Sequence, residues 1–220
     1  FVTNSFDGFA GNGDNTAPNL TQVTAITTPS NDTTPSYVFT TDEAGTISTS
    51  ISQGFSTSSS ASTGSNQTII FNTLPEGTYS GETITVTDTA GNPGSITIPD
   101  FVIDTAAPTV SSFTLSDSAL KSGETATVTI EFSEAVTGFA SNDDITVPNG
   151  SLPPMTSSDN ITWTGTYTPT AGIEDDSNVL TLATSYTDTV GNAGPSATTA
   201  NFTIDTAAPT VSSFTLSDSA

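Results

Sequence analysis

Sixteen residues, DTAAPTVSSFTLSDSA, occur twice in this chain without a change, at Asp104–Ala119 and again at Asp205–Ala220. A second motif accompanies them: TDTAGN at Thr87–Asn92 returns as TDTVGN at Thr187–Asn192, each time shortly before the Asp-x-x-x-Pro motif. A looser copy of the first motif, DNTAP, begins at Asp14. Repetition at an interval the size of a small domain is typical of tandem arrays of one structural unit.

The aspartates of these motifs divide the chain into four segments. We expect residues 1–14 to be the tail of a preceding repeat or a leader, and residues 15–104 and 105–205 to be two complete domains. Residues 206–220 are then the first strand of a next repeat. Because the sequence opens on Phe1 and stops within a motif, we expect a fragment of a longer protein.

Apolar and polar residues alternate within each unit. Ile84 and Val86 alternate with threonines in residues 82–88, and residues 125–132 and 161–167 show the same period of two. This pattern predicts half-buried antiparallel strands, about six or seven in each unit, separated by Gly-, Asn- and Asp-rich turns. Residues 53–66, rich in Ser, Thr and Gly, are predicted as one long loop. The predicted fold is all-β: tandem immunoglobulin-like β-sandwich domains arranged end to end, with a β-barrel as the alternative.

Nearly all charged residues of the chain are acidic. It has 23 acidic residues, one Lys, no His and no Cys, and its net charge is -22. Nucleic acids and anionic membranes are bound through Lys and Arg, so neither is an expected partner, and no apolar run is long enough for membrane insertion. Most nucleophile–base pairs need His or Cys, and no insertion that would build a cleft around two carboxylates is evident. We therefore do not expect an enzyme.

Acidic residues gather at one end of each predicted sandwich. In a seven-stranded sandwich, the loop after the second strand and the loop before the last strand lie where the chain enters. Calcium takes about six to eight oxygen ligands, so these loops and the preceding linker predict a calcium site. Solvated turn residues remain the alternative, since Asp and Asn favour turns for local reasons. The candidate ligands are Asp14, Asp42, Glu43, Asp88, Asn92, Asp104, Glu134, Asp188, Asn192 and, at the start of the next joint, Asp205.

Four stretches of the second unit, FSEAVTGF (132–139), DITVPNG (144–150), YTPT (167–170) and YTDTVGN (186–192), resemble tandem bacterial Ig-like repeats. Such repeats occur in giant surface adhesins and biofilm-associated proteins of the RTX type. The first unit resembles a sister variety through YVFTTDEAG (37–45). The resemblance covers nearly the whole chain beyond residue 14. At the first joint it departs from the pattern, because Asp42-Glu43 stands in place of Ser-Glu-Ala-Val.

The resemblance implies a structural extender that holds an adhesive tip away from the cell and is stiffened by calcium at its domain junctions. It implies an extracellular place at the bacterial cell surface and export by a type I system. The expected partners are calcium ions and neighbouring repeats of the same chain, and the chain itself is expected to be a monomer. The alternative is a glycan- or protein-binding Ig-like adhesive module, which a cluster of exposed aromatic residues would favour. Trp163 is predicted in the core, because it shares a strand face with Ile161 and Tyr167.

Overall fold

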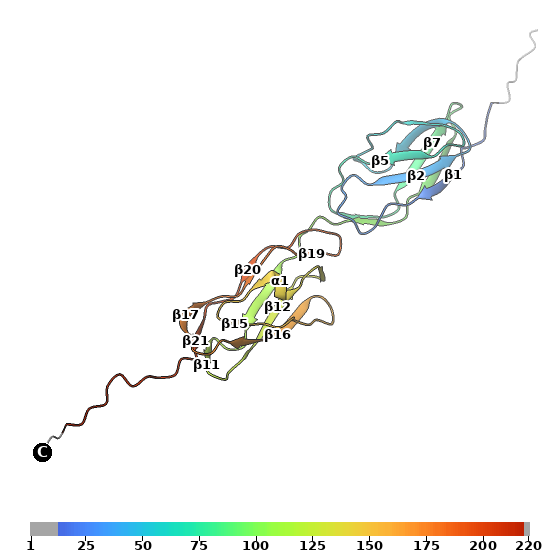
Figure 1. Ribbon diagram of the computed structural model, residues 1–220. Helices are drawn as coiled ribbons and strands as arrows, with labels where there is room; N and C mark the ends of the chain where they lie inside the picture. The colour runs from blue at the N-terminus through green and yellow to red at the C-terminus, as the bar shows by residue number, and fades with distance from the viewer. Residues whose placement is uncertain (1–12, 218–220) are drawn as a thin grey trace, which may run out of the picture. The chain divides into compact units, whose positions relative to one another are not determined.

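The computed structural model describes residues 13–217, which form two compact units. One unit ends at Thr105 and the other begins at Ala106. Each is a two-layered β-sandwich with its own core (Figure 1). No helix within residues 13–217 is long and apolar enough to cross a membrane. The parts of the predictions that concern residues 1–12 and 218–220 lie outside the described residues.

The first unit has a three-stranded layer and a longer opposing layer. The first layer has the antiparallel order β1 (Leu20–Thr24), β2 (Ser36–Thr41), β5 (Gln67–Ile70). The second has the order β4 (Ser60–Ala61), β3 (Gly45–Thr49), β7 (Thr83–Asp88), β8 (Pro93–Thr97). A further pair is formed by β6 (Gly77–Tyr79) and β9 (Phe101–Ile103). Ser30 bridges Ile103 in parallel, so the segment after β1 also reaches the last strand.

The second unit repeats this plan with more interruptions. Its first layer has the order β10 (Val110–Leu115), β12 (Ala126–Phe132), β16 (Thr162–Pro169), β15 (Gly150–Ser151). The opposing strands pair as β11 (Ala119–Lys121), β21 (Phe202–Asp205), β17 (Glu174–Asn178); as β14 (Ile145–Thr146), β18 (Thr181–Leu182), β20 (Ala197–Thr198); and as β13 (Val136–Thr137), β19 (Thr187–Asp188). The strands β11 and β21 are parallel, like the bridge in the first unit. A short helix, α1 (Ser141–Asp144), separates β13 from β14.

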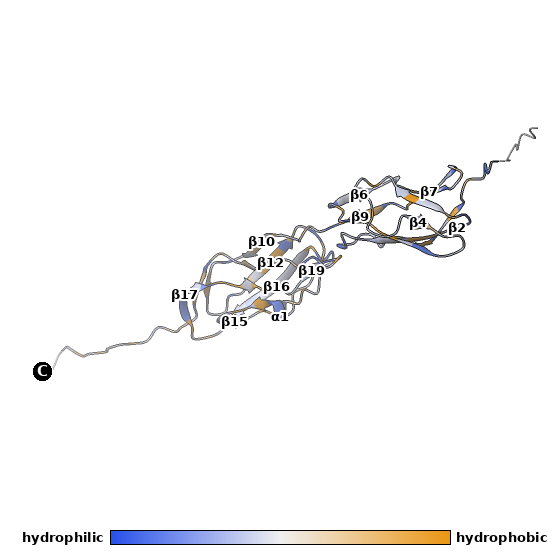
Figure 2. Cartoon of the chain, turned by 90° about the horizontal axis from the view of Figure 1, so that it is seen from above, coloured by the Kyte–Doolittle hydropathy of each residue, from blue (hydrophilic) through white to orange (hydrophobic). Residues whose placement is uncertain are grey.

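Alternating side chains build the two cores, as the period of two predicts. On β12, Val128, Ile130 and Phe132 are buried while the threonine and glutamate between them face outward. On β7, Ile84 and Val86 are fully buried. Figure 2 shows the apolar residues along these strands. Each fully buried side chain of this size contributes about 1.5–3 kcal/mol, so a sandwich of this kind is stable without a disulfide.

Residues 53–66 are more ordered than the predicted single loop. They contain β4, whose Ala61 is buried and pairs with Gly45 of β3. Phe55 bridges Phe71 in antiparallel register and packs against the first core. The Ser- and Thr-rich composition hid these contacts, because two apolar residues are enough to hold the segment on the sandwich.

The two identical stretches differ in structure. In the first copy, Phe113 of β10 lies opposite Ile130 of β12 and is 7% exposed. In the second copy, residues 206–217 form no strand and Phe214 is 96% exposed. The predicted strand at 206–220 is therefore absent from its described part. The local sequence is the same, so the difference lies in β12, for which residues 13–217 offer the second copy no counterpart.

Candidate metal centre

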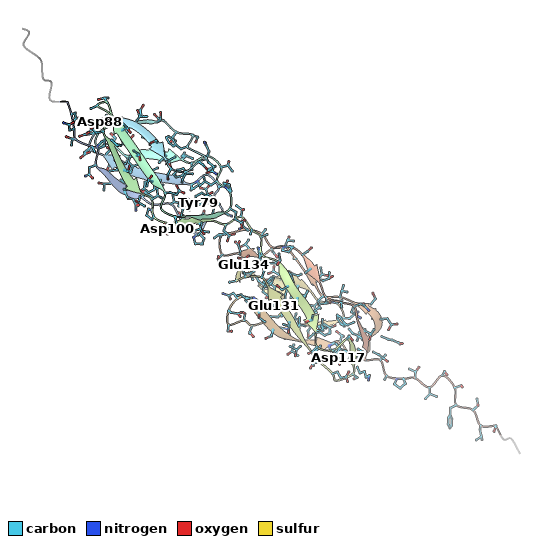
Figure 3. The ribbon with its side chains drawn as sticks, turned by 180° about the vertical axis from the view of Figure 1, so that it is seen from behind. Tyr79, Asp88, Asp100, Asp117, Glu131 and Glu134 are labelled. Atoms are coloured by element: carbon cyan, nitrogen blue, oxygen red, sulfur yellow. The ribbon has the colours of Figure 1, made fainter. Side chains whose placement is uncertain are left out.

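Two loops of the first unit meet at one end of the sandwich, which we call the linker end because the chain enters the first strand there. The strands β3 and β7 are antiparallel with Gly45 opposite Asp88, so the residues before β3 lie beside those after β7. Gly94 leaves room for the incoming chain, since a Cβ there would lie 1.7 Å from the carbonyl oxygen of Pro18. Figure 3 shows Asp88 at the linker end of this unit and Tyr79 at the opposite end.

Three carboxylates converge at the linker end of the first unit. Asp14, Glu43 and Asp88 each offer one oxygen, and these oxygens all lie within 4.8 Å of one another. Asp14 is exposed, whereas Glu43 and Asp88 are half-buried. The single Lys of the chain, Lys121, belongs to the other unit. Like charges at this separation repel, so the cluster opposes folding unless a cation or a proton neutralises part of it.

Glu43 is the least satisfied member of the cluster. Its Oε2 atom is buried and has no hydrogen-bond partner among the described residues. Burial raises the pKa of Glu43 above its usual value, and the charges of Asp14, Asp42 and Asp88 raise it further. A buried acceptor without a donor is uncommon in folded proteins. A hard cation among these oxygens would give Oε2 a partner and offset the repulsion, so the residues fit calcium.

Asp88 is held in place by the residue four positions later. The backbone N–H of Asn92 donates to Oδ1 at 2.8 Å, and the side-chain Nδ2 of Asn92 donates to Oδ2 at 2.8 Å. These bonds from Asn92 are the largest influence on the pKa of Asp88 and hold it below the usual value. Gly91 has a φ of 95°, which favours glycine in this tight turn. The loop therefore presents an ionised carboxylate in a fixed position.

Asn92 also contacts the incoming chain. Its Nδ2 donates to the backbone carbonyl of Asp14 at 2.9 Å, in addition to its bond to Asp88. The sequence marked Asn92 as a candidate ligand. In the structure its amide nitrogen joins the linker to the loop that carries Asp88, which is the geometry of a residue that positions ligands.

Asp42 lies beside the cluster rather than in it. It is exposed, and its Oδ1 accepts a hydrogen bond from the backbone N–H of Asn19 at 2.7 Å. The three converging oxygens come from Asp14, Glu43 and Asp88. Of the two adjacent acids in this loop, Glu43 therefore faces the cluster, while Asp42 caps the start of β1 and adds negative charge nearby.

The second unit has an equivalent arrangement around Asp188. Val136 of β13 lies opposite Asp188 of β19, which brings Glu134 beside the last loop, and the two carboxylates lie within 4.8 Å of each other. Figure 3 shows Glu134 at the linker end of this unit and Asp117 at the other. Asn192 Nδ2 donates to Asp188 Oδ2 at 2.7 Å and to the carbonyl of Ala106 at 3.1 Å. As in the first unit, the Asn joins the loop to the chain that enters its own sandwich.

Asp188 is more deeply enclosed than Asp88. It is 1% exposed, and its Oδ1 accepts backbone hydrogen bonds from Val190, Gly191 and Asn192 at 2.9, 2.7 and 2.9 Å. Burial alone raises the pKa of Asp188, but these bonds and the Asn192 amide outweigh it, so the pKa lies below its usual value. Asp188 is therefore a buried carboxylate whose charge the surrounding donors stabilise.

Asp104 and Asp205 are the two remaining candidates. Asp104 belongs to the first unit, is half-buried, and donates its backbone N–H to the carbonyl of Ser30 at 2.9 Å. Asp205 is exposed and ends β21, opposite Lys121 of β11 and Glu174 of β17. Because β12 begins just after β11, Asp205 lies at the end of the second unit opposite Glu134. The structure does not bring Asp205 to the acidic loops of its own unit.

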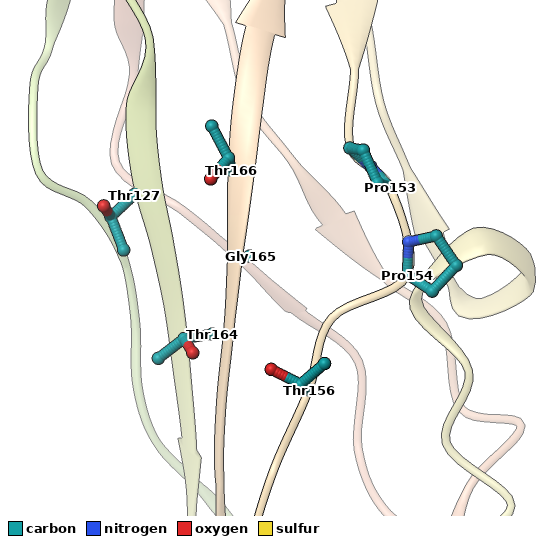
Figure 4. A pocket seen from close by; sticks show the side chains of 7 residues that line it. All are labelled: Thr127, Pro153, Pro154, Thr156, Thr164, Gly165 and Thr166. Carbon is teal, nitrogen blue, oxygen red and sulfur yellow. The ribbon is translucent and has the colours of Figure 1, made fainter.

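A shallow hollow of about 360 Å³ lies on the outer face of the second unit (Figure 4). It lies beside β16 and is lined by hydroxyl groups and two prolines, with no aromatic side chain: Thr127, Pro153, Pro154, Thr156, Thr164, Gly165 and Thr166. Trp163, the residue best suited to stack on a sugar, instead packs edge to face on Phe139 with ring centroids 4.9 Å apart. Its predicted place at the core is confirmed.

Comparisons with known proteins bear mainly on the second unit. Residues 104–204, a little under half of the chain, match a family described as "Bacterial Ig-like domain". No curated protein matches the chain.

Three solved structures resemble the chain at low identity. A chimeric titin Z1Z2 is 11% identical, with 86% of this chain and 95% of that chain covered and a TM-score of 0.28. Invasin, described as a bacterial integrin-binding protein, is 15% identical, with 86% and 40% covered and a TM-score of 0.31. The D0-D1 domain of intimin is 14% identical, with 82% and 97% covered and a TM-score of 0.27. The family match makes the second unit similar to bacterial Ig-like domains, and the opposed layers of paired strands give both units the fold of an immunoglobulin-like sandwich.

Proposed function

We propose that this chain is an extender segment of a bacterial cell-surface adhesin, stiffened by calcium at the linker end of each domain. Such a segment works outside the cell, as a monomer, and holds an adhesive tip at a distance. The similarity of the second unit to bacterial Ig-like domains and the succession of two sandwiches support this proposal. The observation that carries it is the buried, unpartnered oxygen of Glu43 in a cluster with Asp14 and Asp88.

The three carboxylates come from different segments of the chain, so an ion bound to all of them would join these segments. Asp14 precedes the first strand, whereas Glu43 and Asp88 belong to loops of the folded sandwich. A cation bound by all three ties the incoming segment to the domain. Asn92 supports this tie, because its amide already joins Asp14 to Asp88. Bound calcium therefore removes freedom from the segment before the domain, and a joint with less freedom makes a stiffer rod.

The same assignment extends to the second unit by sequence. Asp104 stands before Thr-Ala-Ala-Pro as Asp14 stands before Asn-Thr-Ala-Pro, and both prolines are buried. We assign Asp104 to the second site with Glu134 and Asp188, and Asp205 to the equivalent place before a following domain. Asn92 and Asn192 position the aspartates, and Asp42 adds negative charge beside the first site.

Calcium fits these residues better than magnesium does. Calcium accepts irregular sets of carboxylate, carbonyl and water oxygens, whereas magnesium requires a near-ideal octahedron and keeps several waters. The ligands proposed here come from the linker and two loops, which is the kind of irregular set that calcium tolerates. Three carboxylates also supply enough negative charge to hold a divalent ion in a chain whose net charge is -22.

The adhesive-module alternative has less support from the described residues. Among residues 13–217, Phe214 is the one exposed aromatic side chain, and the threonine-lined hollow offers nothing for a sugar ring to stack on. Glycan sites usually combine stacking surfaces with a few polar groups. The extender is therefore the function that these observations favour.

A calcium titration of the whole chain tests the proposal. Calorimetry should show calcium-specific binding that Glu43→Gln weakens and Asp100→Asn leaves unchanged. Asp100 is an exposed acid of the same unit whose side chain accepts no hydrogen bond from the described residues, so it is a matched control for the loss of one charge. Small-angle scattering of the same samples should show a narrower distribution of shapes with calcium. Equal binding by both variants, or no binding, would contradict the proposal.

A further inference from the structure

The turn at Asn149–Gly150 combines a reactive dipeptide with an unusual set of hydrogen bonds. We propose that Asn149 is a site of spontaneous deamidation, and that Asp175 and Asn178 restrain the reaction by holding its side-chain amide. Neither calcium nor the extender role is needed for this reaction. It would modify the second unit covalently, in the turn that leads into β15.

The fold favours Asn or Gly at position 149 and requires Gly at position 150. Asn149 has a φ of 50°, in the left-handed region that Asn and Gly adopt most readily. A Cβ on residue 150 would lie 2.4 Å from Cζ of Tyr167 and 2.7 Å from the carbonyl oxygen of Thr168, so only glycine fits. Tyr167 is fully buried and donates its hydroxyl to the carbonyl of Pro148 at 2.8 Å. Gly150 therefore cannot be exchanged without disturbing the core, and a bulky or β-branched residue at position 149 would be strained.

The chemistry needs only the chain and water. The backbone nitrogen of Gly150 attacks Cγ of Asn149 and loses its proton, the bond from Cγ to the amide nitrogen breaks, and ammonia leaves. The resulting cyclic imide takes up water and opens at either carbonyl, which gives aspartate or isoaspartate. Glycine places no side chain in the path of the attack, which makes this dipeptide reactive. The sequence contains one more Asn-Gly pair, at 12–13, whose Asn lies outside the described residues.

The folded domain holds the amide of Asn149 on two sides. Its Nδ2 donates to Asp175 Oδ2 at 2.8 Å and to Asn178 Oδ1 at 2.9 Å. Asn178 is fully buried, and its own Nδ2 donates to the carbonyl of Asp175 at 3.0 Å and to that of Phe202 at 3.3 Å. These acceptors belong to β17 and are fixed against β21. For Cγ to turn toward the nitrogen of Gly150, both bonds of the Asn149 amide must break.

Deamidation would damage this network irreversibly. A carboxylate at position 149 cannot donate to Asp175, and it places a second negative charge where a donor stood at 2.8 Å. Isoaspartate also lengthens the backbone beside Gly150, which packs closely against Tyr167. Since the unfolded chain has no such restraint, the extent of modification at 149 would record how long the second domain has spent open.

Peptide mapping by mass spectrometry tests this inference on the intact chain. The wild type, the wild type in urea, Asp175→Ala and the control Asp176→Ala are incubated in mildly alkaline buffer, and the modified fraction of Asn149 is followed in time. The Asp176→Ala substitution removes the same charge one residue away, and no hydrogen bond joins the Asp176 side chain to Asn149. We expect the urea sample to react fastest, Asp175→Ala about five-fold faster than the wild type or more, and Asp176→Ala at the wild-type rate.

Two outcomes would overturn the inference. One is a folded wild type that deamidates at Asn149 as fast as the chain in urea. The other is an Asp175→Ala variant that reacts as slowly as Asp176→Ala. Circular dichroism checks that both variants are folded. Asp175→Leu keeps a similar side-chain shape without any acceptor and serves if the alanine variant does not fold; its rate should lie between those of the wild type and the urea sample, and a wild-type rate would equally overturn the inference.

Discussion

The aspartate loops of the two units, Asp88–Asn92 and Asp188–Asn192, have nearly the same sequence but different surroundings. In both, the Asn amide donates to the Asp carboxylate and to the backbone of the incoming chain. Asp88 is half-buried, whereas Asp188 is 1% exposed and accepts three backbone bonds at one oxygen. The local motif therefore builds the same hydrogen-bonded loop twice, and the rest of each sandwich decides how far its charge is removed from water.

The glutamates differ as well. In the first unit, Glu43 has Asp42 as its neighbour, and its buried Oε2 has no partner among the described residues. In the second unit, Glu134 follows Ser133, and the buried carboxylate is that of Asp188 instead. In the first site, the glutamate is therefore the carboxylate whose negative charge is disfavoured. In the second site, the buried carboxylate is an aspartate whose charge backbone hydrogen bonds already stabilise. The two sites should respond differently to the same kind of substitution.

The largest difference should appear when the aspartates are truncated. Asp188→Ala removes a buried carboxylate and leaves the backbone N–H groups of Val190, Gly191 and Asn192 without this acceptor, which should cost the second unit about 3 kcal/mol of unfolding free energy. Asp88→Ala should cost the first unit less, because Asp88 itself is only half-buried. Urea unfolding in the presence of a chelator separates this effect from metal binding. Trp163 reports the second unit by fluorescence, since it is the only Trp of the chain. Equal costs would show that burial does not distinguish the loops.

Glu43→Gln should have opposite effects with and without calcium. Without calcium, the substitution removes a charge that burial and three aspartates disfavour, so the first unit should become more stable. With calcium, it removes a ligand, so the stabilisation by the ion should shrink. Hydrogen exchange on amides of β3 and β7 follows the first unit alone. A variant that is less stable in both conditions would indicate that Glu43 is held by contacts other than those described here.

The two asparagines should act as positioning residues at both sites. Asn92→Ala and Asn192→Ala should each lower calcium affinity about tenfold, the effect typical of residues that orient a ligand without binding the ion. Backbone bonds continue to hold both aspartates, and the loss should be smaller in the second unit because Asp188 is also buried. Calorimetric titration of each variant measures this. A complete loss of binding at either site would instead make the Asn a direct ligand.

The smallest expected effect is a difference in pH dependence without calcium. The pKa of Glu43 is raised from 4.5, so the folded first unit binds more protons than its unfolded state in the window above 4.5. Its stability should therefore rise as the pH falls through that raised pKa. The pKa of Asp188 is lowered from 3.8, so its contribution to the second unit is present above 3.8 and is lost only in stronger acid. Unfolding curves over mildly acidic pH, read separately for each unit, should show the first gaining while the second does not. If the stability of both units changed with pH in the same way, this predicted difference between the units would be wrong.

Sequence patterns predicted the sandwich well where the signal was local and periodic. The alternation of Val128, Ile130 and Phe132 gave β12, and strand order alone indicated that Glu43 and Asp88 would meet. The patterns could not say which of Asp42 and Glu43 faces the cluster, since adjacent residues in a turn point in different directions. They also could not show that the Asn92 amide binds Asp88 and the linker, because the contact with Asp14 crosses most of the domain.

The repeated stretch shows the limit of local sequence most clearly. Val110–Leu115 forms a strand, whereas the identical residues 211–216 do not. A strand is defined by its partner, and β12 comes from a different part of the chain. No propensity scale can distinguish two identical sequences. In the same way, Asp88 and Asp188 differ in exposure through neighbours that their shared motif does not contain.

The most direct test of the calcium proposal is a thermal melt of the whole chain in millimolar calcium and in excess EGTA, with magnesium as the control. Ion binding to the folded state stabilises it by a free energy that grows with the logarithm of ion concentration over the dissociation constant, and so raises the melting temperature. We predict that calcium, and not magnesium, raises the melting temperature of the first unit strongly and also raises that of the second unit. The fluorescence of Trp163 monitors the melting of the second unit. Identical melting curves in calcium, magnesium and EGTA would contradict the proposal and leave the acidic clusters as solvated turns.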